Sequence, residues 1–216
     1  MMFPAPAIRA YRAAGALAIL VAIGYQVSKG LQMRHWSAAD YFGYFTILSN
    51  LFAAAVLLSG ALHGPGPRSM TAQLLRGAAV MYMLTTGLVW AVLLSGKPAP
   101  TPWVNAIVHQ IMPPVMACDW ALDPPSMRLT LRRTLLWLSF PIVYIVYTLT
   151  RGAIVNWYPY FFVNPNHSGG YLAVAAGVLV IGAGMIGLIV LITWAGNRRL
   201  ASHGSTPRGL AAETQA

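Results

Sequence analysis

The chain has 216 residues, of which 57% are hydrophobic and only 8% are charged. A soluble domain carries about 25% charged residues, so the composition excludes a soluble enzyme, a disordered chain and a nucleic-acid-binding module. The net charge of +10 reflects a scarcity of acidic residues, which number 4: Asp40, Asp119, Asp123 and Glu213. We therefore expect an integral membrane protein whose surroundings are membrane lipids.

Apolar runs of membrane length occur repeatedly along the chain. Segments with glycine, proline or charged residues separate them and indicate turns, because proline removes a helix donor and glycine relaxes the backbone. We predict an all-α fold, a polytopic membrane helix bundle with six transmembrane helices at 8–27, 41–62, 73–95, 103–122, 132–150 and 171–195. Residues 1–195 then form a single domain, and residues 196–216 form a basic, disordered cytoplasmic tail.

The basic residues are divided unevenly between the two sides of this bundle. Lys29, Arg34, Lys97 and Arg151 lie on one side. The other side, with both termini, has Arg9, Arg12, Arg68, Arg76, Arg128, Arg132, Arg133, Arg198, Arg199 and Arg208. Because cytoplasmic segments of membrane proteins are rich in Lys and Arg, both termini are predicted to be cytoplasmic and to face anionic lipid headgroups.

Polar side chains in two of the spans point to chemistry, because a polar group in hydrocarbon needs a partner or a function. Thr46, Ser49 and Asn50 share one face of the second span, and Asn105 and His109 share one face of the fourth. Both spans enter from the outer side, which places Thr46 and His109 at a similar depth of roughly 8–9 Å. A hydroxyl beside an imidazole is the minimum for a base-activated nucleophile.

The same residues also have structural interpretations. A threonine hydroxyl in a membrane helix commonly bonds the carbonyl one turn earlier, and His109 can simply bond to Asn50 or to a tyrosine. Pro113 and Pro114 remove two backbone donors below His109, so the fourth span should bend there. That bend either opens a cavity or serves packing alone.

The fifth span carries a polar stripe of Tyr144, Tyr147, Thr148 and Arg151, which ends at the outer mouth. Arg151 either binds a carboxylate or a lipid phosphate or extends to the membrane interface. The aromatic residues of 157–160 indicate an interfacial belt.

Two acidic residues, Asp119 and Asp123, lie near the cytoplasmic end of the fourth span, close in sequence to the arginines of 128–133. Paired carboxylates can perform acid–base chemistry. A structural ion pair is the simpler interpretation, and at about 15 Å along the helix the pair is too far away to support His109.

The residues Tyr44 to Asn50, followed one hairpin later by Asn105, His109 and Pro113, resemble the androgen-induced-gene family of membrane proteins, which includes the androgen-dependent TFPI-regulating proteins. The stretches 144–152 and 157–160 are similar to its bacterial branch, and the resemblance covers residues 8–195. It implies an intramembrane hydrolase of fatty acid esters of hydroxy fatty acids in a bacterial inner (plasma) membrane. It also implies Thr46 as the nucleophile and His109 as the base.

The sequence therefore predicts a lipid-ester hydrolase in which His109 takes the proton of Thr46 and Thr46 attacks the ester carbonyl. Support for the substrate or the oxyanion is assigned to Asn50, Asn105, Ser49, Tyr147 and Arg151. The expected partners are a lipid or fatty-acyl ester substrate and membrane lipids, and the mechanism requires no cofactor and no metal.

Two other functions remain open. A metal-dependent lipid hydrolase would gather His35, Asp40, His109 and His167, all on the outer side, although they lack the spacing of an intrahelical metal-binding pair. A non-enzymatic lipid-binding or transport protein would need only a cavity and Arg151, although no internal repeat typical of transporters is evident.

Overall fold

The computed structural model describes residues 4–96 and 98–204, and the regular secondary structure of these residues is entirely helical. The α-helices are α1 (Ala5–Gly30), α2 (Ala38–Tyr41), α3 (Phe45–His63), α4 (Met70–Val89), α5 (Pro102–Ala106), α6 (Met112–Leu122), α7 (Leu131–Thr134), α8 (Ser139–Val155), α9 (Pro165–Ser168) and α10 (Tyr171–Gly204). Two π-helical turns are η1 (Trp90–Leu94) and η2 (Ile107–Ile111), and two 3-10 turns are η3 (Leu135–Leu138) and η4 (Phe161–Val163).

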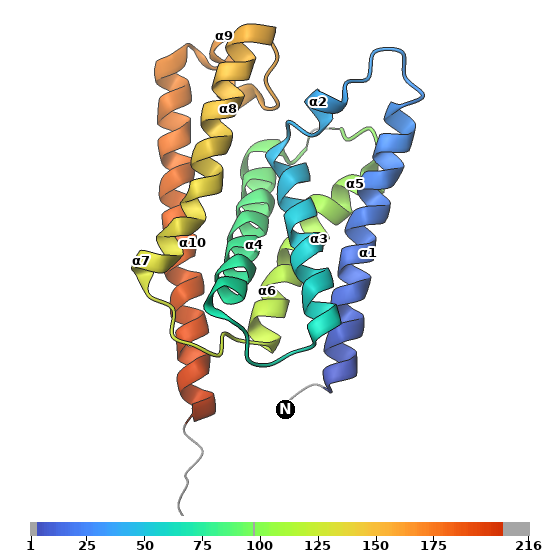
Figure 1. Cartoon of the computed structure of the whole chain (residues 1–216). Coiled ribbons are helices and arrows are strands. Elements are labelled where there is room, and N and C mark those ends of the chain that lie inside the picture. Colours follow the sequence, from blue (N-terminus) through green and yellow to red (C-terminus); the bar gives the residue numbers. More distant parts are fainter. Residues whose placement is uncertain (1–3, 97, 205–216) are drawn as a thin grey trace, which may run out of the picture.

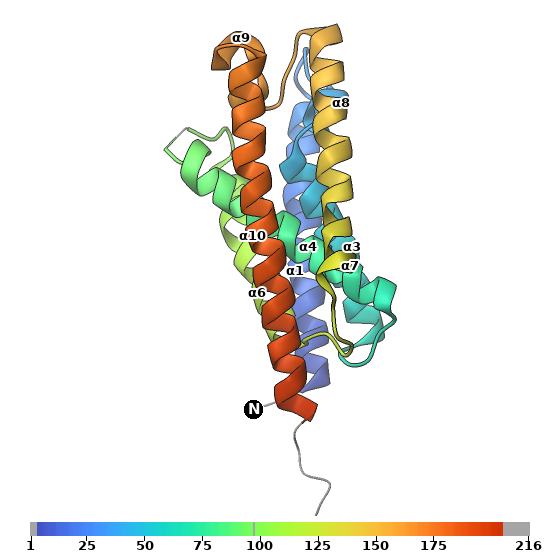
Figure 2. The same ribbon diagram turned by 90° about the vertical axis from the view of Figure 1, so that its left-hand side faces the viewer.

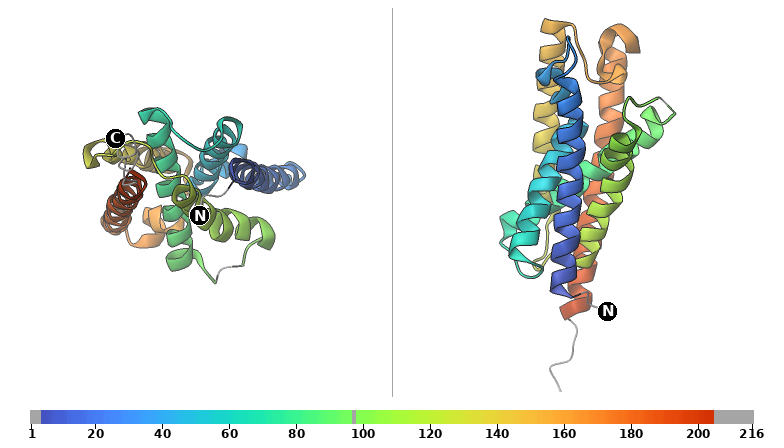
Figure 3. Two further views of the ribbon diagram at one scale, coloured as in Figure 1. Left: turned by 90° about the horizontal axis from the view of Figure 1, so that it is seen from below. Right: turned by 90° about the vertical axis from the view of Figure 1, so that its right-hand side faces the viewer.

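The long helices lie side by side in an elongated bundle (Figure 1). We call the end that carries α2 and α9 the upper end, and the opposite end, where α1 begins, the lower end. The chain rises in α1, descends in α3, rises in α4, descends through α5 and α6, rises in α8 and descends in α10 (Figures 1 and 2). The first turn of α1 and the last turn of α10 therefore lie at the same end, as the side view in Figure 3 also shows.

Five helical stretches of the described residues are long and apolar enough to cross a membrane: 5–30, 45–63, 70–94, 131–155 and 171–200. This confirms an all-helical protein with several candidate membrane spans at the predicted places. The sixth predicted span, 103–122, is not among them. It is the helical stretch from α5 through η2 to α6, which a π-helical turn interrupts and which carries the polar side chains of Asn105, His109 and Asp119.

The last helix is longer than expected. We predicted a disordered tail from residue 196, but α10 continues to Gly204; the part of the predicted tail that lies outside the described residues is 205–216. The extra turns are held against the α6–α7 connection. The Asn197 side chain accepts from the backbone N–H of Leu129 at 2.9 Å and donates to the Leu129 carbonyl at 2.8 Å, and Arg199 donates to the Ala121 carbonyl at 2.8 Å.

A buried cluster of charges closes the lower end of the bundle. Arg12 donates to Asp119 at 2.5 Å and to Asp123 at 2.7 Å. Arg76 donates to Asp119 at 2.8 Å, and Arg68 donates to Asp123 at 2.6 Å. The five side chains are only 1–12% exposed, so this charge cluster ties α1, α4 and α6 together.

The charge cluster agrees with the simpler interpretation of Asp119 and Asp123 as members of a structural ion pair, and it shows which arginines are their partners. The arginines of 128–133 are adjacent in sequence, whereas the actual partners come from α1, from α4 and from the loop before α4. The second oxygen of Asp123 accepts from the backbone N–H of Gly66 at 3.2 Å. All four carboxylate oxygens of Asp119 and Asp123 thus accept hydrogen bonds, and none is left for acid–base chemistry.

Candidate functional site

Thr46 lies in the first turn of α3, where backbone N–H groups have no partner within the helix. Two tyrosine hydroxyls supply the missing acceptors. The Tyr144 hydroxyl on α8 accepts from the N–H of Phe45 at 3.1 Å, and the Tyr160 hydroxyl, just before η4, accepts from the N–H of Thr46 at 3.2 Å. The start of α3 is therefore fixed against α8 and the 157–163 segment.

The segment that carries Tyr160 packs closely on α8 two residues before it, at Tyr158. A Cβ atom at Gly152 of α8 would collide with the ring of Tyr158, so only glycine allows this ring to pack on the helix. The ring of Tyr44 packs edge-on against Tyr160 with centroids 5.4 Å apart, and Phe162 stacks on Tyr160 at 5.0 Å. The Tyr160 hydroxyl is consequently directed at Thr46.

His109 lies in the π-helical turn η2, which directly precedes the paired prolines. Pro113 has no N–H to donate to the His109 carbonyl, so the regular ladder cannot continue there, and π-helical turns are frequent at functional sites. Gly87 lets α4 approach this turn, because a Cβ there would lie 2.9 Å from Pro113. The ring of Trp90, in η1, stacks on the His109 ring with centroids 6.0 Å apart.

The hydrogen bonds around Thr46 determine where the protons lie. His109 Nδ1 is 3.2 Å from the carbonyl oxygen of Asn105, which can only accept, so Nδ1 carries the proton. In the neutral imidazole, His109 Nε2 is then an acceptor, and the Thr46 hydroxyl, 3.2 Å away, donates to it. The Tyr160 hydroxyl lies 3.3 Å from Thr46 Oγ1 and donates to it in turn. The result is a series of hydrogen bonds in which Tyr160 donates to Thr46, Thr46 donates to His109, and His109 donates to the carbonyl of Asn105.

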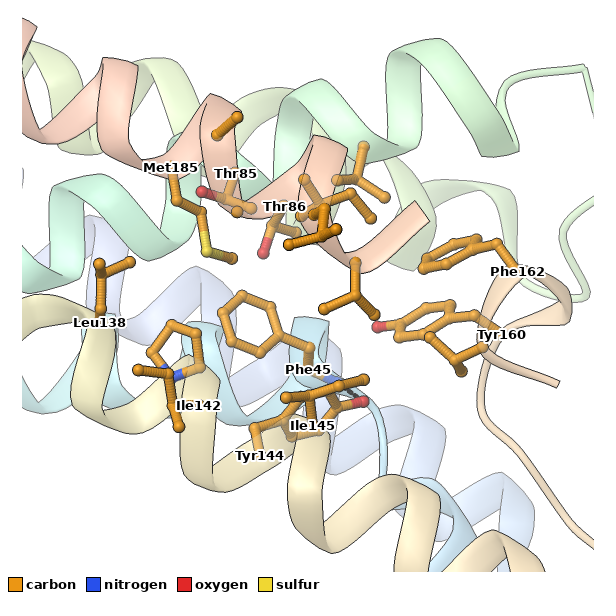
Figure 4. Close-up of a pocket in the computed structure, with 18 of the residues that line it drawn as sticks. Phe45, Thr85, Thr86, Leu138, Ile142, Tyr144, Ile145, Tyr160, Phe162 and Met185 are labelled. Carbon is orange, nitrogen blue, oxygen red and sulfur yellow. Dashed lines mark hydrogen bonds between the residues drawn. The ribbon is translucent and has the colours of Figure 1, made fainter. Parts of the chain in front are cut away.

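Thr46 also lines a cavity of about 490 Å³ between α3, α4, α8 and α10 (Figure 4). The volume falls within the range of about 300–1,000 Å³ that is usual for ligand pockets. No charged side chain lines the cavity in the described part of the chain. Leu138 lies at one end of it and Phe162 at the other, with the Tyr160 hydroxyl near the Phe162 end. His109 is not among the lining residues and lies behind Thr46.

The cavity is open on one side. Ile142 of α8 and Leu179 of α10 line the cavity and yet are 57% and 73% exposed. The opening therefore lies between α8 and α10 and is bordered by apolar side chains. A molecule in the surroundings of the helices can reach Thr46 through it without passing a charged group.

Of the residues predicted to support catalysis, Asn50 has a positioning role. Its amide donates to the carbonyl of Thr46 at 2.8 Å and to the carbonyl of Val108 at 3.1 Å, which ties α3 to η2. Both amide hydrogens are used, so Asn50 has none to donate to an oxyanion. Asn105 contributes its backbone carbonyl to His109. Ser49 is fully buried, and its hydroxyl has no hydrogen-bond partner among the described residues.

The two predicted support residues on α8 lie outside the site. Tyr147 is 51% exposed. Arg151 is ion-paired with Asp40 of α2 at 2.5 Å, and its guanidinium lies 5.0 Å from the ring centroid of Trp157. Arg151 thus joins α8 to α2, and its charge is already balanced by Asp40. This pairing is neither of the two roles that the sequence left open, binding of a carboxylate or phosphate and extension to the membrane interface.

The alternative metal site is not assembled. In residues 4–96 and 98–204, no group of three or more His, Cys, Asp or Glu side chains is placed to hold a metal ion. His35, Asp40, His109 and His167 therefore do not form a common ligand set.

Sequence reasoning missed two residues of this site. Tyr160 was interpreted as part of an interfacial belt that could also shape the entrance, and Trp90 carried no signal at all. Both lie far from Thr46 and His109 in sequence, so only the packing of the helices brings them together. The one available hint was that a buried tyrosine hydroxyl needs a hydrogen-bond partner.

The fold and the site together define a class of protein: a bundle of membrane-length helices that holds a hydroxyl–imidazole pair beside an apolar cavity. No family model, no curated protein and no solved structure matches the chain. Membership in the androgen-induced-gene family therefore stays a prediction, and the function is argued from the geometry.

Proposed function

We propose that the protein is an intramembrane hydrolase of lipid esters, with Thr46 as the nucleophile and His109 as the general base. The observation that carries the proposal is that Thr46 Oγ1 lies 3.2 Å from His109 Nε2 while Thr46 also lines the apolar cavity. A nucleophile and its base are recognised by contact at about 2.6–3.2 Å, with a third group that orients the base. The carbonyl of Asn105 is that third group.

The proposal includes six membrane crossings. The stretch from α5 to α6 runs between the two ends of the bundle like its neighbours (Figure 1). An even number of crossings, six, is consistent with the first turn of α1 and the last turn of α10 lying at the same end of the bundle. Arginines concentrate toward the lower end, which favours a cytoplasmic location for it and for both termini. The site then faces the outer half of the bilayer, in a bacterial inner membrane if the family resemblance holds.

The cavity favours esters with a long apolar chain. A lining without charge and an opening bordered by Ile142 and Leu179 suit a hydrocarbon chain that enters sideways from the bilayer. Fatty acid esters of hydroxy fatty acids, which the family resemblance implies, belong to this class. Arg151 is not assigned to a substrate carboxylate, because Asp40 neutralises it.

In the proposed reaction, Thr46 Oγ1 attacks the ester carbonyl carbon while His109 Nε2 takes the hydroxyl proton. The Tyr160 hydroxyl turns from Oγ1 to the carbonyl oxygen, which becomes the oxyanion, and the Asn105 carbonyl stabilises the charged imidazolium through Nδ1–H. The C–O bond of the ester breaks, and His109 passes the proton to the leaving alkoxide. Water, deprotonated by His109 Nε2, then attacks the carbonyl carbon of the acyl-threonine. The C–O bond to Thr46 breaks, His109 returns the proton to Thr46 Oγ1, and the carboxylic acid is released.

The test is turnover of a fluorogenic long-chain ester by the purified protein, combined with rapid acid quench and peptide mass spectrometry. We expect hydrolysis and an acyl adduct on the peptide that contains Thr46. The adduct should be absent from Thr46→Val and retained in Thr150→Val, which changes an exposed threonine of α8. Absence of turnover, or turnover without an adduct on Thr46, contradicts the proposal.

A non-enzymatic lipid-binding protein is the second candidate, because the open apolar cavity favours it independently of the hydroxyl–imidazole pair. The two functions separate in one comparison. If wild type and Thr46→Val bind a fluorescent fatty acid equally and neither hydrolyses an ester, the protein is a lipid-binding protein.

Tyr160→Phe removes the proposed oxyanion donor and the acceptor for the Thr46 N–H, but keeps the ring. We expect kcat to fall by about 10²–10³-fold with a small change in KM, because the oxyanion exists only in the transition state. Steady-state kinetics measure both constants. Tyr25→Phe, on α1, is the matched control and should keep the wild-type kcat. An unchanged kcat in Tyr160→Phe shows that another group stabilises the oxyanion.

A further inference from the structure

Thr86 of α4 is a buried polar residue that the proposed mechanism does not use. It lines the cavity, is only 4% exposed, and its hydroxyl has no hydrogen-bond partner among the described residues. A helical threonine commonly bonds the carbonyl one turn earlier, but Thr86 directs its hydroxyl into the cavity instead (Figure 4). Leaving a buried hydroxyl unpaired is unfavourable, so a partner is expected.

The part of the chain that the structure describes offers no such partner nearby. The neighbouring Thr85 donates to the sulfur of Met81 at 3.6 Å. Thr46 and Tyr160 bond each other, and Thr46 also bonds His109. A bound water needs two to four polar partners, whereas the cavity around Thr86 is apolar. The partner must therefore arrive with the ligand.

We propose that Thr86 is a specificity-determining residue that hydrogen-bonds an oxygen-bearing group partway along the lipid chain in the cavity. This group is additional to the ester that Thr46 attacks. A hydroxyl both donates and accepts, so a hydroxyl or a keto group on the chain would serve. The position is mid-chain, because Thr86 lies between the Leu138 end and the Tyr160 end of the cavity (Figure 4). This inference rests on the proposed function, because it assumes that the lipid chain occupies this cavity.

The experiment measures binding, so that it does not depend on turnover. Stearic acid and its positional hydroxystearic acid isomers serve as probes, and the affinity of each is measured by its displacement of a fluorescent fatty acid from the purified protein. The measured quantity is the affinity of each hydroxystearic acid divided by the affinity of stearic acid. For at least one mid-chain isomer, this ratio should be about fivefold lower in Thr86→Val than in the wild type. Valine has the shape of threonine, so stearic acid itself should bind at least as well as before.

Two control variants locate the effect. Thr85→Val should leave the ratio of affinities unchanged, because the Thr85 hydroxyl already has a partner in Met81. Gly182→Phe should weaken the binding of every fatty acid. Gly182 lines the cavity and a Cβ there meets nothing within 4 Å, so a phenyl ring at this position can occupy space that the ligand would fill.

An unchanged ratio for every isomer in Thr86→Val overturns the inference, as does a failure of all the fatty acids to bind the wild type. The outcome is separable from that of the hydrolase proposal. A Thr86-dependent preference without any ester hydrolysis supports this inference and refutes the hydrolase, whereas hydrolysis without that preference refutes this inference alone.

Discussion

Thr46→Val and His109→Ala should each lower kcat for ester hydrolysis by at least about 10³-fold, and the double variant should be no worse than either single variant. The reason is that a nucleophile and its base act as a unit: without the imidazole the hydroxyl keeps its proton, and without the hydroxyl the imidazole has nothing to activate. Steady-state kinetics of the four proteins on one long-chain ester measure the coupling. Thr46→Ser keeps a hydroxyl at this position and should retain measurable activity.

His63→Ala is the matched control, because His63 is an exposed histidine at the far end of α3 whose ring bonds only the Ser59 carbonyl. It should keep wild-type kcat. If the losses of the two single variants multiply in the double variant, Thr46 and His109 act independently and the assignment as a catalytic pair is wrong.

Asp119→Asn should destabilise the folded protein by about 3–5 kcal/mol, because it leaves the buried guanidinium groups of Arg12 and Arg76 without their shared counter-charge. The asparagine keeps the size of the side chain, so the effect reports charge rather than packing. Chemical unfolding in detergent micelles measures it. Asp40→Asn breaks the more exposed pair with Arg151 and should change stability by only about 0–1 kcal/mol. Equal unfolding of Asp119→Asn and wild type contradicts a structural role for the charge cluster.

The charge cluster also sets the direction of a pH dependence. Burial by itself would raise the pKa of Asp123, but the hydrogen bond from Arg12 and the charges of Arg76 and Arg68 hold the pKa below its ordinary value. A carboxyl with a lowered folded-state pKa stabilises the fold above its unfolded-state pKa of about 3.9. That stabilisation is lost as the pH falls through the lower pKa of the folded state. The unfolding midpoint should therefore fall on acidification below about pH 4, and by less in Asp123→Asn.

Much of the bundle could be predicted from the sequence, because the information is local. Each apolar run or polar break is a property of a single helix, and a bilayer requires a fixed length of apolar helix. The five candidate spans consequently fall at five of the six places where spans were expected. The similar depths of Thr46 and His109 also followed from counting residues along two helices, and the hydrogen bond between them agrees with that count.

The partners of each side chain were decided by the tertiary structure. Asp119 and Asp123 bind arginines from α1 and α4 rather than those next to them in sequence, and Arg151 binds Asp40 of the same chain rather than a substrate carboxylate. The Tyr160 hydroxyl reaches Thr46 only because the 157–163 segment packs over the start of α3. The physical reason is that hydropathy and helical periodicity define how deep a residue lies and which face it occupies. The neighbour it meets there depends on how separate helices pack, and that requires all of them together.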